Sequence, residues 1–81
     1  MRYDLEFRKR AAADLASLDH AIADRILQKL DRMRDDLVGD VKRLRNFSPD
    51  YRLRVGDYRV LFAVNFHKII VYRVVHRREA Y

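Results

Sequence analysis

The sequence has no cysteine and no tryptophan, and its 81 residues include only two glycines and one proline. Without cysteine the chain can form no disulfide, and it offers neither a thiolate nucleophile nor a thiolate ligand for a metal. Hydrophobic residues make up 49% of the chain and charged residues 37%. This balance is typical of a soluble globular protein and argues against a disordered or membrane-embedded chain.

Long apolar runs are also missing. No segment approaches the roughly 20 apolar residues that a membrane-spanning helix needs. Residues 1–6 read MRYDLE and carry charges where a secretion signal would have an apolar centre. We therefore expect a cytoplasmic protein that does not interact with membranes. A chain of this length is expected to form one domain, residues 1–81, with a single modest core.

Acidic residues are scarce in the second half of the chain. Residues 1–40 contain eight Lys/Arg and nine Asp/Glu, whereas residues 41–81 contain ten Lys/Arg and three Asp/Glu. The net charge of +6 therefore arises in the second half, and a basic face on a small fold is typical of a nucleic-acid-binding protein. Because the carboxylates there are few, we expect no two-metal nuclease site and no cofactor.

The first half combines one strand with two helices. Residues 3–7 alternate apolar and acidic side chains, which predicts a short strand with one solvent-exposed face. From Arg8 to Leu18 the apolar spacing changes to that of a helix. Asp19 is a suitable N-cap for a second helix, which is predicted to end near Leu37. The short joint between the helices predicts an antiparallel helical hairpin.

The second half is predicted to begin with an irregular connection, residues 38–50, and to continue as three strands, residues 51–55, 58–65 and 68–76. Gly56-Asp57 and Phe66-His67 are the expected two-residue turns between these strands. The order β-α-α-β-β-β predicts an α+β fold in two layers. In this fold the C-terminal strands form an antiparallel sheet, and the helical hairpin packs on its apolar face.

The first of these hairpins brings arginines together. With a two-residue turn at residues 56–57, Arg54 lies opposite Arg59, and Arg52 lies opposite Leu61. Side chains directly across an antiparallel pair are about 5 Å apart, and like charges there repel each other. Because such a pair lowers stability, we expect this face to bind an anion, most simply a phosphate.

The second hairpin decides which side chains join the arginine face. A two-residue turn at residues 66–67 predicts that Leu61 pairs with Tyr72 and Arg59 with Val74. His76 would then lie on the arginine face, whereas a three-residue turn would reverse the faces of the last strand. Arg73 would fall on the apolar face and is unexplained unless it reaches an edge of the sheet.

Residues 51–62 and the ending VVHRREAY, residues 74–81, resemble the RelE/ParE toxin superfamily of type II toxin–antitoxin systems. The resemblance covers essentially the whole chain and is closer to the RelE branch. It implies a ribonuclease that cuts messenger RNA in the ribosomal A site and stops translation. In the expected reaction the substrate's own 2′-hydroxyl attacks the phosphate, so no activation of water by a metal is required.

The resemblance also implies a set of site residues. Arg59 and Arg77 would clamp the scissile phosphate, since guanidinium groups match phosphate oxygens. Arg52 and Arg54 would hold the RNA backbone or supply further charge, and Tyr81 would stack on a base. Further RNA contacts are expected from four solvated cations: Lys42, Arg43, Arg45 and Arg78.

The general base is the open question of this site. The family often has lysine where Arg52 and Arg54 stand, and an arginine with a pKa above ~12 is a poor proton acceptor. His76 is our candidate for the missing acid or base, because a neutral imidazole near pH 7 can take or give a proton. A structural or solvated histidine at the end of a strand is the alternative.

The expected partners follow from the same resemblance. They are the ribosome, messenger RNA and a cognate antitoxin, which we expect to be acidic and partly disordered when free. DNA would be contacted only indirectly, through the antitoxin complex. Two other functions stay open: inhibition of DNA gyrase, as in the ParE branch, and binding of nucleic acid through charge without cleavage.

Overall fold

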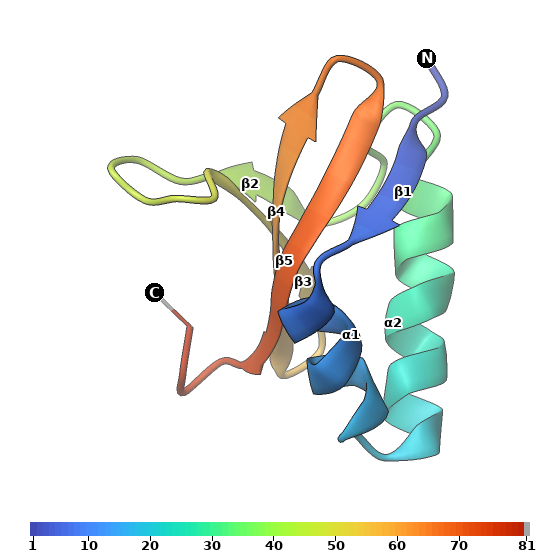
Figure 1. The fold of residues 1–81 in the computed structure, drawn as a ribbon, viewed down its shortest axis with the longest axis vertical. Helices are drawn as coiled ribbons and strands as arrows, with labels where there is room; N and C mark the ends of the chain where they lie inside the picture. Colours follow the sequence, from blue (N-terminus) through green and yellow to red (C-terminus); the bar gives the residue numbers. More distant parts are fainter. Residues whose placement is uncertain (81) are drawn as a thin grey trace.

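A computed structural model describes residues 1–80 and shows a sheet with two helices packed on one side (Figure 1). The elements in chain order are β1 (Asp4–Phe7), α1 (Lys9–Ala16), α2 (His20–Met33), β2 (Val41–Arg43), β3 (Tyr51–Val55), β4 (Tyr58–Asn65) and β5 (Lys68–His76). The predicted two-layer α+β fold is therefore confirmed, as are the predicted bounds of the last three strands. Within the described part of the chain, neither helix is long and apolar enough to cross a membrane.

The sheet has five strands in the order β1-β5-β4-β3-β2. β1 runs parallel to β5, and the other neighbouring strands are antiparallel. β2 lies inside the segment that was predicted to be irregular, so that prediction is wrong for three residues. A strand of this length, with exposed Lys42 and Arg43, has too little apolar alternation to be recognised, and its pairing with β3 defines it.

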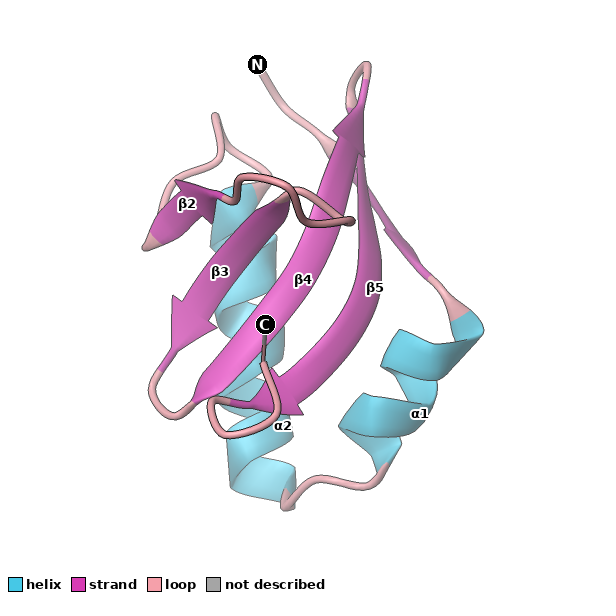
Figure 2. Cartoon of the chain, turned by 90° about the vertical axis from the view of Figure 1, so that its left-hand side faces the viewer, coloured by secondary structure: helices cyan, strands magenta, loops and turns pink. Residues whose placement is uncertain are grey.

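The core lies between the sheet and the helices. Figure 2 shows α2 behind the sheet and α1 beside β5, with the opposite face of the sheet toward the viewer. Ile26, Leu30 and Met33 of α2 are fully buried against the sheet, because a helical spacing of three and four residues places them on one side. The sheet contributes alternate residues of its strands, which are also buried: Leu53, Val55, Val60, Phe62, Ile69, Val71 and Val74.

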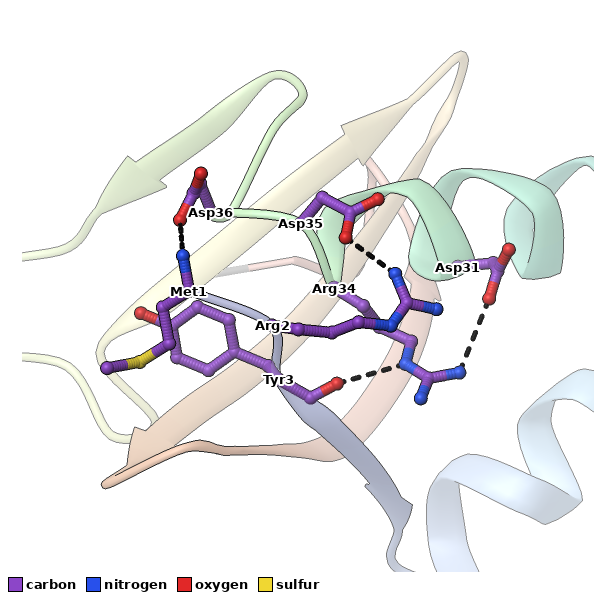
Figure 3. Close-up of polar contacts among 7 residues, drawn as sticks. All are labelled: Met1, Arg2, Tyr3, Asp31, Arg34, Asp35 and Asp36. Carbon is purple, nitrogen blue, oxygen red and sulfur yellow. Dashed lines mark hydrogen bonds and ion pairs between the residues drawn. The ribbon is translucent and has the colours of Figure 1, made fainter.

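The second helix ends four residues earlier than predicted. Asp19 occupies its N-cap as expected, although its side chain makes no capping hydrogen bond. At the other end, Asp36 and Leu37 have φ angles of 55° and 58°, which a continuing helix excludes. The N-terminal segment holds this bend: Arg34 Nε donates to the carbonyl of Tyr3 at 3.0 Å, and the amino group of Met1 pairs with Asp36 (Figure 3).

A β-bulge changes the predicted register of the second hairpin. Phe62 pairs with Val71 as the two-residue turn requires, but Leu61 then pairs with Arg73, and Arg59 with Val75. The extra residue is Tyr72, which is not paired with any residue of β4. The predicted pairs of Leu61 with Tyr72 and Arg59 with Val74 are therefore wrong by one residue.

The bulge keeps a charged side chain out of the core. In the unshifted register Arg73 would lie opposite buried Val60, whereas in the observed register Val74 takes that place. Arg73 instead reaches the edge of the sheet, where its Nε lies 2.8 Å from Oδ2 of Asp14 in α1. The same carboxylate accepts the backbone N–H of Val74 at 2.9 Å. Because β1 ends before this point, Asp14 satisfies an edge donor that has no neighbouring strand.

Asp14 therefore links α1 to the edge of the sheet through contacts that depend on its ionisation. Its partial burial opposes ionisation, but the hydrogen bonds from Arg73 and from the Val74 backbone outweigh this, so its pKa is lowered from the ordinary value. A carboxyl group with a lowered pKa in the folded state stabilises the fold above its unfolded pKa. This stabilisation is lost as the pH falls through the folded pKa.

We predict that Asp14→Asn lowers the free energy of unfolding at neutral pH by about 1.5–3 kcal/mol, the range for hydrogen bonds to charged groups. The difference from the wild type should begin to shrink as the pH falls below about 3.9, the ordinary pKa of an aspartate, and should disappear only below the lower folded-state pKa, where the wild-type carboxyl is also neutral. Urea unfolding at several pH values measures both effects. Asp31→Asn is the control, because exposed Asp31 pairs with Arg34 at 3.5 Å and should cost less than about 1 kcal/mol. Equal losses in the free energy of unfolding for the two variants would contradict this role of Asp14.

Candidate functional site

We call the face of the sheet that is turned toward the viewer in Figure 2 the open face. The predicted arginines of β3 and β4 lie on it, because they alternate with residues that are buried in the core on the helix side. Side chains of directly paired residues lie on the same face. One row across the strands is Lys42, Arg52, Leu61 and Arg73, and the next row contains Arg54, Arg59 and Val75. The predicted pairing of Arg54 with Arg59 is thus confirmed. Leu61, Ile70 and Val75 are buried on this same side and form an apolar floor.

Arg52 and Arg54 share one carboxylate of their own chain. Nη1 of Arg52 lies 3.1 Å from Oδ1 of Asp40, and Nε of Arg54 lies 2.8 Å from Oδ2. Nη1 of Arg52 also donates to the carbonyl oxygen of Asp40 at 2.7 Å, and its side chain is only 13% exposed. The hydrogen bond from Arg52, followed by the charge of Arg54, lowers the pKa of the Asp40 carboxyl. Asp40 therefore stays ionised and partly neutralises the open face.

Arg59 turns toward the β3–β4 turn rather than toward Arg54. Its Nη1 donates to the carbonyl of Gly56 at 3.0 Å and to that of Tyr58 at 3.1 Å. Gly56 has a φ of 58°, which fits a two-residue turn with glycine first, as the sequence predicts. Because Arg54 engages Asp40 and Arg59 engages the turn, the two cations are drawn to different partners and their repulsion is reduced.

The C-terminal segment brings Arg77 to the same turn. Its backbone N–H donates to the carbonyl of Asp57 at 2.7 Å, and its Nε lies 3.9 Å from Oδ1 of that residue. The Arg77 side chain is 61% exposed, so its contact with Asp57 leaves it accessible to a ligand. Arg59 and Arg77, which were predicted to act together, are thus both attached to the turn at residues 56–57. Tyr81, the predicted base-stacking residue, lies outside the described residues.

His76 does not share a face with Arg59, and this prediction is wrong. Because of the bulge, His76 pairs with Tyr58, which lies on the helix side of the sheet. The two rings meet edge to face with centroids 5.4 Å apart, and Nδ1 of His76 accepts the backbone N–H of Arg78 at 3.2 Å. The sequence did contain an indication of the bulge: in a regular register the charged side chain of Arg73 would be buried in the core.

The remaining predicted cations flank the open face. The loop between β2 and β3 projects from the sheet (Figure 1). Arg43, the last residue of β2, pairs with Asp50 of this loop at 3.5 Å and lies over the ring of Tyr51 at 5.8 Å from its centroid. Lys42 and Arg45, on this side of the sheet, and Arg78, in the C-terminal segment, are exposed. Lys42, Arg45 and Arg78 extend the positive surface around the paired arginines, whereas Arg43 pairs with Tyr51, which packs against the core, and lies on the helix side of the sheet.

The open face can stabilise negative charge but, within residues 1–80, holds no histidine near Arg54 or Arg59. His20 begins α2, His67 lies in the β4–β5 turn, and His76 lies on the other side. Guanidinium groups remain protonated at neutral pH, so they bind phosphate oxygens without taking up a proton. Asp40 is the residue that sequence reasoning missed. The sequence shows that it directly precedes the basic segment of residues 41–43. The sequence does not show which arginines its side chain contacts.

Comparisons with known proteins identify the family to which this chain is similar. Residues 5–81 match the family model of the ParE toxin of type II toxin–antitoxin systems, parDE. Toxin RelE3 of Methanocaldococcus jannaschii is 43% identical over 47 residues, which span 58% of this chain and 53% of that protein. Putative toxin RelE1 of the same organism is 29% identical over 98% of this chain and 93% of its own.

A solved structure extends the similarity to three dimensions. The archaeal RelE–RelB complex from Pyrococcus horikoshii contains a chain that is 32% identical to this one, with a TM-score of 0.80. The alignment covers 99% of this chain and 100% of that one. The family model and the structural similarity both span nearly the full length, so the chain belongs to the RelE/ParE superfamily of type II toxin–antitoxin toxins.

Proposed function

We propose that this protein is a ribosome-dependent endoribonuclease that cleaves messenger RNA in the ribosomal A site and thereby inhibits translation. The observation that carries the proposal is the gathering of cations from β2, β3, β4 and the C-terminal segment on the side of the sheet that the helices leave open. A surface of this kind matches the phosphate backbone of a single RNA strand.

The reaction requires stabilisation of charge more than activation of water. Attack by the 2′-hydroxyl on the adjacent phosphate forms an O2′–P bond and breaks the P–O5′ bond, with the 2′-hydroxyl proton given up to solvent water and the departing 5′-oxygen protonated from it. Negative charge builds on the phosphate oxygens during this step, and nearby guanidinium groups lower the energy of that state. Arg59 and Arg77, both held at the β3–β4 turn, are the proposed clamp on the scissile phosphate. Arg52 and Arg54 would bind the neighbouring backbone, and Tyr81 would stack on a base.

The proposed partner in the resting state is a cognate antitoxin. The similar chain from Pyrococcus horikoshii was solved in a RelE–RelB complex, and the positive open face would attract an acidic, partly disordered chain that folds on binding. DNA would be reached only through such a complex, and the cytoplasm, where ribosomes reside, would be the place of action.

Gyrase inhibition is a second candidate, because the matching family model is that of the ParE toxin. A supercoiling assay with purified gyrase separates the two functions, since a translation inhibitor should leave supercoiling unchanged. Inhibited supercoiling together with intact messenger RNA would favour this candidate over RNA cleavage.

We predict that Arg59→Ala and Arg77→Ala each reduce cleavage of ribosome-bound messenger RNA by about 10²–10³-fold, the effect of removing one donor to a developing oxyanion. Cleavage is measured by primer extension after cell-free translation with added protein. Arg10→Ala is the matched control, because exposed Arg10 lies at the start of α1, outside the strands that form the open face. Undiminished cleavage by folded Arg59→Ala and Arg77→Ala would reject the clamp.

The position of His76 gives a prediction that separates its two interpretations. Because its ring packs against Tyr58 on the helix side, we expect His76→Gln to retain cleavage within a few-fold while losing some thermal stability. Primer extension on ribosome-bound messenger RNA measures the cleavage, and a thermal melt measures the stability. A large loss of cleavage in a variant that melts like the wild type would restore His76 as the acid or base.

A further inference from the structure

Three carboxylates each contact a cation that the proposed function assigns to RNA. Asp50 lies 3.5 Å from Arg43, and Asp57 lies 3.9 Å from Arg77. Asp40 alone of these three contacts two such cations, Arg52 and Arg54, and its contacts are the shortest of the three sets. It therefore has the greatest effect on the charge that the open face presents.

The backbone and the side chain of Asp40 have different roles. Its carbonyl oxygen accepts hydrogen bonds from the backbone N–H of Arg54 at 3.0 Å and from the Arg52 side chain at 2.7 Å, which fixes this residue beside β3. Its carboxylate places one oxygen on each arginine, as two oxygens of a phosphate would do. The side chain is 46% exposed, so an incoming anion can compete with it from solvent.

We propose that Asp40 is a specificity-determining residue, a built-in counter-ion that occupies the phosphate position at Arg52 and Arg54 in the free protein. The inference rests on the proposed function, because it assumes that these arginines bind single-stranded RNA. An RNA phosphate must displace the carboxylate, so the open face binds free RNA weakly when charge is the only attraction. RNA that is held in place by further contacts overcomes this competition.

The salt dependence of RNA binding tests the counter-ion directly. Each phosphate that is contacted contributes about 0.7 to the slope of log affinity against log salt for a single strand. If Asp40 already neutralises Arg52 and Arg54, Asp40→Asn should steepen this slope by about 0.7–1.4 and raise affinity at low salt several-fold. The probe is a fluorescently labelled single-stranded RNA without ribosomes, and the measurement is anisotropy over a KCl series.

Two controls isolate the charge of Asp40. Asp31→Asn makes the same change in net charge on α2, away from the open face, and should leave the slope unchanged. Asp40→Glu keeps the charge and should retain the wild-type slope. The double variant Asp40→Asn/Arg54→Gln should return toward the wild-type slope, because the released cation is removed. Asp40→Ser replaces Asp40→Asn if a thermal melt shows that the latter does not fold.

The possible outcomes separate this inference from the proposed function. A steeper slope for Asp40→Asn but not for Asp31→Asn supports the counter-ion, even if no variant inhibits translation and the proposed nuclease activity fails. A slope that does not change, or that changes equally in both variants, overturns the inference even if the wild type cleaves messenger RNA. Absence of RNA binding by wild type and Asp40→Asn alike also overturns it.

Discussion

The burial of one face of the sheet is the constraint on which the rest of the structure depends. Two amphipathic helices cover the apolar side chains of β3, β4 and β5, and these strands alternate, so every second residue must point away from the core. Arg52, Arg54 and Arg59 occupy such positions. Their gathering on one surface is a consequence of the packing on the other surface.

A surface rich in arginine must be stable before any ligand arrives. Oxygen atoms of the chain itself accomplish this: Asp40 engages Arg52 and Arg54, the carbonyl of Gly56 engages Arg59, and Asp57 engages Arg77. Apart from that of the largely buried Arg52 side chain, these contacts are exposed or half-exposed, and their separate contributions to stability are small. The same weakness allows an RNA phosphate to replace them, so the contacts that stabilise the free protein also set how readily it accepts a polyanion.

The bulge in β5 and Asp14 of α1 together determine how the C-terminal part of β5 is arranged. The bulge removes Arg73 from the core side, and Asp14 then binds both this side chain and the neighbouring backbone N–H. The shift moves His76 away from the arginines and against Tyr58. A contact at the edge of the fold thereby determines which side chains reach the surface proposed to bind RNA.

The sequence by itself determined the three C-terminal strands, the turn at Gly56, and the opposition of Arg54 and Arg59, because alternation and a two-residue turn are local features. It also indicated both helices and the basic half of the chain. Only the tertiary structure decided the strand at β2, the side taken by His76, and the engagement of two arginines by Asp40. These depend on pairing between segments that are distant along the chain, and no local pattern specifies a shift of one residue or the partner of a charged side chain.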